Sequence, residues 1–314
     1  MAPDAAGPDK DWRVNRSVLT LLLVVAAVSG SCGEPGERRT AERPEQPQQS
    51  APVAASWLSR YDLGDDDVAS FRLAKPLGEI SGLAMMKDGR LFCHDDESPI
   101  IYQIDESGTI VKRFTIGSGF MEEDFEGIAV KEDTLFMVNS SGSIFEFLES
   151  GDREHSEFTL FRTPLSRRND VEGLEYDPET DCLLLACKDE PGDGYDGFKA
   201  VYAFSLRTRS LEAKPRFLIP LKEVEKKARK GKFNPSGIAL HPVSGTFFII
   251  SADGELAIEI DRTGRILDQR KISGKVNSQP EGIVFTKDNT MLIANDGQGE
   301  RGTLTVYPAG KEGE

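Results

Sequence analysis

The sequence predicts an all-β protein, a five-bladed β-propeller in which each blade is a four-stranded antiparallel sheet. A short phrase, a polar residue followed two positions later by Glu or Ser and then by Gly and an aliphatic residue, occurs five times. Its glycines are 45, 46, 64 and 45 residues apart along the 314-residue chain. A period near 45 residues is typical of a propeller blade, and the runs after each phrase alternate as strands do. The five copies of the phrase are residues 79–83, 124–128, 170–174, 234–238 and 279–283.

Each phrase begins the first strand of a blade, and a turn then leads to a second apolar strand. The turns contain residues that favour preset or left-handed backbone angles, and they are residues 87–89, 131–133, 177–179, 241–245 and 287–289. Second strands are expected at 90–93, 134–138, 183–187, 246–250 and 290–294. Third strands are expected at 100–104, 143–147, 200–204 and 303–307, and fourth strands at 110–114, 158–161 and 265–271.

The ring needs a closing strand and room for one insertion. Residues 69–77 precede the first phrase and would supply the outer strand of the last blade, which closes the ring. The interval of 64 residues fits one blade with an insertion, and residues 220–231 have helical composition and end in a glycine, so a short helix is expected there. Six blades are the alternative count if the N-terminal stretch contributes more than one strand, and a β-sandwich or barrel is the alternative architecture.

Residues 1–32 are typical of a bacterial lipoprotein signal peptide. The apolar run 18–28 has 11 residues and follows two arginines, whereas a membrane-spanning helix needs about 20 residues. Small residues then lead to Cys32, the predicted lipidation site, with ordinary cleavage or an uncleaved anchor as alternatives. Residues 33–55 are rich in Pro, Glu, Gln and Arg and are expected to form a disordered tether. The propeller domain, residues 56–314, would then be lipid-anchored in the bacterial cell envelope and face the periplasm or the cell exterior.

The charge and the cysteines limit the function classes. The formal net charge is −15, from 53 acidic and 38 basic side chains, and such a surface repels phosphate backbones, so we expect no nucleic-acid binding. The cysteines form no CxxC metal or redox pair, and Cys93, Cys182 and Cys187 are expected to be buried free thiols. We expect a monomer.

The repeated phrases and their surroundings resemble the SdiA-regulated (YjiK-like) proteins and, more distantly, NHL-repeat propellers. The resemblance lies in EISGLA and LFCHDDESPIIYQIDESGTIVKRF, in DFEGIAV, and in DVEGLEYDPETD with LLLACKDEP. It extends over about residues 69–308, nearly the whole predicted propeller. The resemblance implies a five-bladed propeller, export or membrane anchoring, and a calcium site formed by the propeller, but it implies no particular activity.

Side chains at one repeat position should meet at the propeller axis, because the innermost strands line the central channel. The position before the glycine holds Ser81, Glu126, Glu172, Ser236 and Glu281. Three glutamates around one axis repel one another without a counter-charge, and Ca²⁺ accepts six to eight oxygen ligands in flexible geometry. We therefore expect a calcium site, with the ligands Glu126, Glu172 and Glu281 and the nearby residues Asn139 and Asp296. Alternatively, the glutamates accept backbone N–H groups of neighbouring blades and bind no ion.

Three further residues, His94, Asp96 and Lys188, are expected to face a ligand at the channel mouth. Lys188 could also serve as an internal counter-ion. We expect a non-enzymatic, membrane-anchored, calcium-binding module that binds a protein or a small molecule. The alternative is a calcium-dependent hydrolase of the lactonase or phosphoesterase type, in which the ion acts as a Lewis acid. The GxGxxG stretch at 297–302 lies between two predicted strands, so we expect a hairpin loop there rather than a phosphate site.

Overall fold

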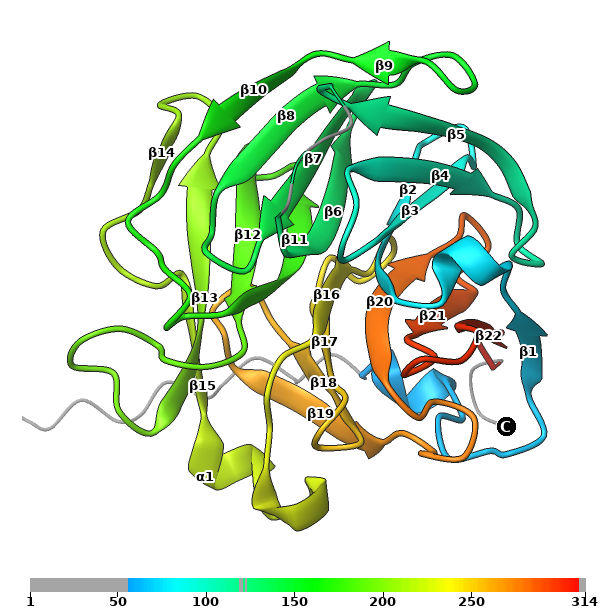
Figure 1. The fold of residues 1–314 in the computed structure, drawn as a ribbon. Coiled ribbons are helices and arrows are strands. Elements are labelled where there is room, and N and C mark those ends of the chain that lie inside the picture. The colour runs from blue at the N-terminus through cyan, green and yellow to red at the C-terminus, as the bar shows by residue number, and fades with distance from the viewer. Residues whose placement is uncertain (1–55, 119–120, 122, 311–314) are drawn as a thin grey trace, which may run out of the picture. The chain divides into compact units, whose positions relative to one another are not determined.

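The strands form five antiparallel sheets, which follow one another in chain order around a central axis (Figure 1). The computed structural model describes residues 56–118, 121 and 123–310. The innermost strands begin at or next to the repeated phrase and are β2 (Ile80–Met85), β6 (Phe125–Lys131), β11 (Val171–Asp177), β16 (Gly237–Leu240) and β20 (Pro280–Phe285). The predicted five-bladed propeller is confirmed. The predicted signal peptide with Cys32 and the predicted tether lie outside the described residues.

Blades 1, 2 and 4 follow the predicted four-stranded pattern. Outward from β2, blade 1 contains β3 (Leu91–Asp95), β4 (Ile100–Ile104) and β5 (Ile110–Ile116). Outward from β6, blade 2 contains β7 (Thr134–Asn139), β8 (Ile144–Leu148) and β10 (Phe158–Phe161). Outward from β16, blade 4 contains β17 (Phe247–Ser251), β18 (Leu256–Ile260) and β19 (Ile266–Lys271). The short strand β9 (His155–Ser156) pairs in parallel with β5 and so joins the outer edge of blade 1 to the chain of blade 2.

Blade 5 closes the ring with a strand from the other end of the chain. Its strands are β20, β21 (Met291–Asn295), β22 (Thr303–Tyr307) and β1 (Ala69–Arg72). β1 pairs antiparallel with β22 from Ala69 opposite Val306 to Arg72 opposite Thr303. The predicted closing strand is therefore confirmed. Every strand of the ring lies between β1 and β22, so the five sheets need no segment from outside this part of the chain.

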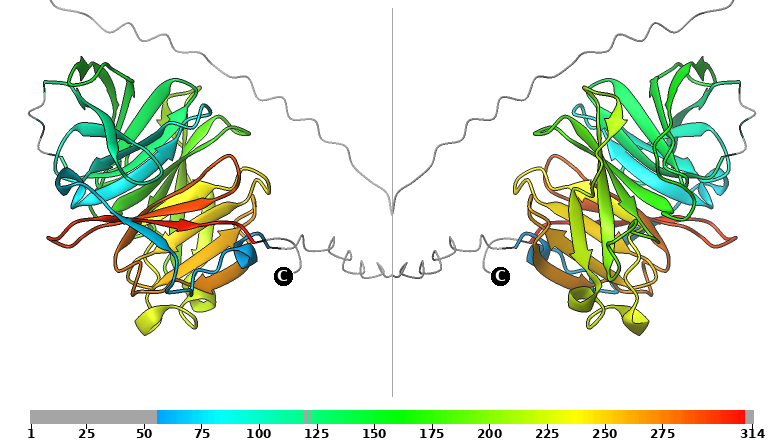
Figure 2. Two further views of the ribbon diagram at one scale, coloured as in Figure 1. Left: turned by 90° about the vertical axis from the view of Figure 1, so that its right-hand side faces the viewer. Right: turned by 90° about the vertical axis from the view of Figure 1, so that its left-hand side faces the viewer.

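Blade 3 contains the insertion. Its strands β12 (Cys182–Cys187) and β13 (Phe198–Ser205) follow β11, and the outer position is shared by β14 (Ser210–Leu211) and β15 (Phe217–Pro220), which both pair with β13. The predicted helix is shorter than 220–231: α1 spans only Leu221–Val224 and lies at the edge of the molecule (Figure 2). A left-handed residue, Lys230 (φ 53°), follows within two turns, and so short a helix depends on packing of Val224 into the core.

The first hairpin of every blade contains a residue in the left-handed backbone region. These residues are Gly89, Glu132, Asp181, Gly245 and Asn289. Left-handed backbone angles favour the tight reversal between two twisted strands. The turn chemistry therefore agrees with the predicted positions, although in blade 3 the left-handed residue lies two positions beyond the predicted turn.

The repeated glycine is required where innermost strands of neighbouring blades come closest. A Cβ at Gly127 would lie 2.8 Å from the backbone nitrogen of Leu174 in blade 3, and a Cβ at Gly282 would lie 3.0 Å from that of Leu83 in blade 1. The glycines of blades 1, 3 and 4 meet the next blade in the same way, at 3.2, 3.2 and 2.5 Å from its backbone. The five contacts complete the circle. The glycine of the repeated phrase thus allows each inner strand to contact the next, and these contacts close the inner ring.

The core consists of five clusters of buried side chains, one between each pair of neighbouring blades. In β7, Leu135 and Met137 pack toward blade 1, whereas Phe136 and Val138 pack toward blade 3. Both faces of such a strand are buried, which explains its continuous apolar run. Cys93, Cys182 and Cys187 are buried and free, as predicted. Among the described residues, no helix has the length and apolar character of a membrane span.

Candidate functional site

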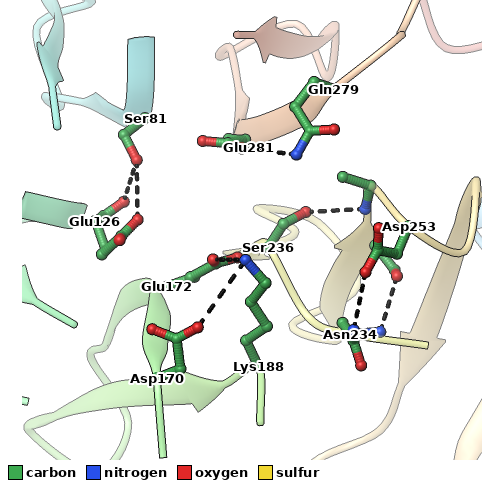
Figure 3. A network of polar contacts seen from close by, with 12 residues as sticks. Ser81, Glu126, Asp170, Glu172, Lys188, Asn234, Ser236, Asp253, Gln279 and Glu281 are labelled. Carbon is green, nitrogen blue, oxygen red and sulfur yellow. Dashed lines mark hydrogen bonds and ion pairs between the residues drawn. The ribbon is translucent and has the colours of Figure 1, made fainter. Parts of the chain in front are cut away.

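A β-bulge places the residue before the repeated glycine at the axis. In β2, β6, β11 and β20 the register with the second strand shifts at this residue, which leaves Ser81, Glu126, Glu172 and Glu281 outside the regular ladder. A bulge bends the strand and redirects a side chain. In blade 4, Ser236 comes just before β16 and donates its hydroxyl to the Pro280 carbonyl at 2.6 Å. The five side chains surround one small space (Figure 3).

Glu126 is a largely buried carboxyl group without a cationic partner among the described residues. Its side chain accepts a hydrogen bond from the Ser81 hydroxyl at 3.3 Å. Burial, together with the negative charges of Glu172, Asp124 and Glu281, raises the pKa of Glu126 to about 10. A carboxyl group in this position therefore either keeps its proton or requires a positive charge close by.

Glu172 and Asp170 share one positive charge, that of Lys188. The Lys188 ammonium group forms an ion pair with the Glu172 carboxylate and lies 4.0 Å from Asp170 Oδ2 (Figure 3). Burial raises the pKa of Glu172 to about 8, although Lys188 acts to lower it. Carboxylate oxygens of Glu126, Asp170 and Glu172 lie within 4.8 Å of one another. One lysine thus faces three carboxyl groups.

Glu281 approaches the same space from the opposite side. Gln279 donates a hydrogen bond to its carboxylate at 3.1 Å. Burial raises the pKa of Glu281 to about 7, and the charges of Asp296 and Asp96 add to the effect. The inner strands of all five blades enclose a cavity of about 10 Å³ between these residues, which is about the room that one water molecule or ion needs.

Further acidic groups surround this end of the channel, which we call the acidic mouth. Its members are Glu79, Asp96, Asp124, Glu126, Asp170, Glu172, Glu281 and Asp296. Burial, together with the charges of Glu79 and Asp95, raises the pKa of Asp96 to about 6. One buried oxygen of Asp96 has no hydrogen-bond partner among the described residues. The structure thus places Asp96 within reach of the charges of Glu79, Asp95 and Asp296.

Two of the predicted ligands stabilise loops beside the mouth. The Asn139 side-chain oxygen accepts the Ser143 N–H at 2.9 Å, and its amide donates to Glu123 at 2.6 Å. Asp296 accepts the Gln298 N–H at 2.6 Å, and its charge acts on Glu281 from that loop. The cluster instead includes Asp170, two residues before Glu172, which the sequence analysis did not select as a ligand.

His94 does not face the mouth, contrary to our expectation. Its side chain is completely buried, and its Nε2 would be only 2.7 Å from a Cβ at Gly82. Its Nδ1 lies 2.9 Å from the Asp95 carbonyl oxygen. Burial lowers the pKa of His94 to about 4, so the ring packs inside blade 1 as a neutral group. Gly82 leaves room for the ring because it has no side chain.

The donor set of the acidic mouth fits a hard cation. The oxygens that could reach an ion come from carboxylates and a hydroxyl group, and the nearest histidine is buried elsewhere. Such ligands suit Ca²⁺ or Mg²⁺, whereas zinc and copper prefer nitrogen and sulfur. Glu126, Asp170 and Glu172 are the residues that would hold the ion, with Glu281 facing them.

The fold is shared with solved propeller structures of several kinds. The glutaminyl cyclase of Myxococcus xanthus is 14% identical with a TM-score of 0.50, and the match covers 78% of this chain and 96% of that one. Virginiamycin B lyase of Staphylococcus aureus is 14% identical, with a TM-score of 0.43 and coverage of 76% and 69%. The PQQ-bound aldose sugar dehydrogenase of Streptomyces coelicolor is 13% identical, with a TM-score of 0.45 and coverage of 78% and 99%. At 14% identity, the likeness to the glutaminyl cyclase shows the fold alone.

No curated protein sequence matches the chain. The model of the SdiA-regulated family matches residues 73–297, which include all five copies of the repeated phrase. Because this match spans most of the 314 residues, the chain belongs to the SdiA-regulated family.

Proposed function

We propose that this chain is a lipid-anchored propeller of the bacterial cell envelope that binds Ca²⁺ at its acidic mouth and there recognises a protein or small-molecule ligand. The observation that carries the proposal is the cluster of Glu126, Asp170 and Glu172, whose oxygens lie within 4.8 Å of one another. Lys188 is the cation that contacts the cluster. A divalent cation would remove the remaining repulsion.

The charges support an ion rather than a purely structural role. If the glutamates served only to accept hydrogen bonds, each would be expected to receive backbone N–H groups from a neighbouring blade. The hydrogen bonds that Glu126 and Glu281 accept instead come from the side chains of Ser81 and Gln279. Both residues line a cavity of about 10 Å³. Carboxylate oxygens with unused lone pairs around such a space are what a calcium site requires.

Calcium titration tests this proposal. A chain of residues 33–314 would be titrated with CaCl₂ by calorimetry, and thermal melts would be recorded with chelator and with calcium. We expect one ion per chain, weaker binding in Glu126→Gln and Glu172→Gln, and no change in the control Glu106→Gln, which alters an exposed glutamate of blade 1. Absence of binding in the unaltered chain, or equal binding in all variants, would exclude the site.

The anchor is supported by the run 18–28 and by Cys32. Lipidation of Cys32 followed by the tether would hold the propeller at a membrane surface. In the expressing bacterium, metabolic labelling with an alkyne fatty acid should mark the chain, and Cys32→Ser should abolish the label and move the protein to the soluble fraction. An unlabelled chain would show that the N-terminal segment acts as an ordinary signal or as an uncleaved anchor.

A calcium-dependent hydrolase is the second candidate, favoured by one observation. Asp96 has a pKa near 6 and a buried oxygen without a partner, which suits a general base near neutral pH. His94, however, is completely buried, and the cavity among the carboxylates is too small for a substrate. We therefore favour binding. Turnover of lactone or phosphoester substrates that requires calcium and is lost in Asp96→Asn would establish the hydrolase instead.

A further inference from the structure

The central channel opens at its other end into a second, larger cavity of about 610 Å³. We call it the apolar funnel. It is lined by the C-terminal parts of the innermost strands and by the turns that follow them, from residues 83–87 in blade 1 to 284–287 in blade 5. All five blades contribute to it. Its volume falls within the range of about 300–1,000 Å³ that is usual for small-molecule sites.

The wall of the funnel is mostly aliphatic and aromatic. Leu83, Ile128 and Val284 line its narrow part, and Leu240 and Phe285 line it toward the opening. These residues follow the glycine ring along the same strands, so the wall continues the inner surface of the propeller. Nothing in the described part of the chain fills the space.

One acidic group in the wall is bound by backbone. The Glu175 carboxyl accepts the Leu240 N–H at 3.1 Å and the Tyr176 N–H at 2.8 Å. Burial raises its pKa to about 7, so at pH 7 this group is only about half ionised. Two backbone donors already occupy its oxygens, which makes it part of the wall.

The rim carries the opposite charge to the acidic mouth. Lys87, Lys131 and Lys287 line the cavity together with one exposed acid, Glu132. The exposed acids Asp88 and Asp288 follow two of these lysines in the turns but are not part of the lining. Lys131 pairs with Asp181 at 2.6 Å. Among the described residues no ion pair within 4.0 Å engages the ammonium groups of Lys87 and Lys287, although the charge of Lys287 acts on Asp88 from a longer distance. They occupy the same repeat position in adjacent blades, five residues after the glycine. In a chain of net charge −15, this rim is a local exception.

We propose that the apolar funnel binds an amphiphilic small molecule with an aliphatic chain and an anionic head group, the chain against the wall and the head at Lys87 and Lys287. Burial of apolar surface supplies the affinity. The two lysines select the charge of the head group, because a carboxylate or phosphate at the rim gains a partner that the protein does not provide internally. This site lies at the opposite end of the channel from the proposed calcium site and does not depend on it.

The chain itself supplies the main competing occupant. The described residues begin at Ser56 on the same side of the ring, where Trp57 packs on His241 at 4.5 Å between ring centroids, next to Pro242 of the funnel. The segment that precedes Ser56 in the sequence is the chain's own candidate occupant. It carries no acidic group between Gln46 and Ser56, so its charge does not match the lysine rim. We therefore favour a separate anionic ligand.

Dodecanoate, used below its critical micelle concentration, is the probe for this proposal. Calorimetry on residues 33–314 should show saturable binding of one molecule, with affinity rising up to about fourfold per methylene from octanoate to dodecanoate. Lys87→Gln combined with Lys287→Gln should weaken binding about three- to thirtyfold at low salt. The matched control, Lys222→Gln with Lys226→Gln, removes two exposed lysines that do not line the funnel and should bind as the unaltered chain does.

Further measurements separate the possible occupants. Dodecylammonium should bind more weakly than dodecanoate. The variant Met85→Glu should not bind dodecanoate, because the charged side chain blocks the funnel, and its melting curve should show that the variant folds. Equal binding of both amphiphiles, or no saturable binding of dodecanoate, would overturn the proposal. The proposal would also fail if a chain beginning at Ser56 bound dodecanoate and the chain of residues 33–314 did not, since the chain's own segment would then be the occupant. It would fail as well if the protein bound anionic vesicles but not free dodecanoate. All titrations are repeated in chelator, where funnel binding should be unchanged even if the calcium site does not exist.

Discussion

Replacement of Glu126 by Gln should stabilise the calcium-free protein at neutral pH, although it removes a side-chain charge at the proposed site. Gln keeps the shape of the side chain and its contact with the Ser81 hydroxyl, but it cannot ionise. The folded-state pKa of Glu126 is about 10, whereas the ordinary value is 4.5. A raised pKa means that the stabilisation is complete below pH 4.5 and is lost as the pH rises toward the folded value.

The size of the effect follows from this difference. At pH 7 the unfolded chain has released the proton while the folded protein retains it, over 2.5 pH units above the ordinary pKa of 4.5. At 1.36 kcal/mol per unit, this costs the folded state about 3 kcal/mol. Glu126→Gln should therefore raise the free energy of unfolding by up to about 3 kcal/mol at pH 7 and by almost nothing at pH 4.5. For a domain of this size, the melting temperature should rise by about 6–12 °C.

Melts in chelator at pH 4.5 and pH 7 measure this difference, and Glu106→Gln is the control. Calcium should reverse the order of the two proteins, because an ion at 1,000 times its Kd stabilises the unaltered chain by about 4.1 kcal/mol and the variant binds it weakly. If Glu126→Gln were destabilising by the same amount at both pH values, the carboxylate would be satisfied by the protein alone. The argument for an ion would then be refuted.

Three other changes test the same structure. In chelator, the melting temperature of the unaltered chain should fall from pH 5 to pH 8, because the pKa values of Glu172 and Glu281 are raised to about 8 and about 7 in the folded protein. Calcium should make the melting temperature depend less on pH in the same melts. Gly127→Ala should cost about 1–3 kcal/mol in urea unfolding because its Cβ would lie 2.8 Å from backbone of blade 3, whereas at Gly64 the nearest atom is 3.8 Å away and Gly64→Ala should be harmless. Lys188→Met should lower the melting temperature in chelator, since it leaves buried carboxylates unpaired, and calcium should restore more of it than in the unaltered chain.

The fold could be predicted because one physical requirement recurs in every blade. The glycine must lack a Cβ where two inner strands meet, as at Gly127 and Gly282, and the hairpin after it must contain a left-handed residue. Both requirements are local, and each leaves a residue type at a fixed spacing. The split outer strand of blade 3 and the short α1 leave no such pattern, because they depend on how the 64-residue interval packs against its neighbours.

The site could be predicted only in part, because repeat position fixes where a strand lies but not which partners a side chain finds. Asn139 ends its strand close to the mouth, yet its side-chain oxygen is occupied by the loop that follows and its side-chain nitrogen donates to Glu123. Asp170 precedes its strand in a left-handed conformation (φ 50°), which no strand alternation describes. His94 lies next to the end of β3, where we expected the mouth, but Gly82 offers it a space inside the blade. These outcomes depend on contacts between segments far apart in sequence.

The propeller is a ring of similar blades, but its mouth is not symmetric, and the asymmetry locates the proposed ion. Two of the five positions before the glycine hold serine, and each hydroxyl is used inside the protein, Ser81 toward Glu126 and Ser236 toward a carbonyl of blade 5. The carboxylates therefore gather on the side of blades 2 and 3, where Glu126, Asp170 and Glu172 meet. Five glutamates would place a cation on the axis and oppose folding by mutual repulsion. With three, the negative charge is concentrated off the axis, where one divalent ion together with Lys188 is sufficient to balance it.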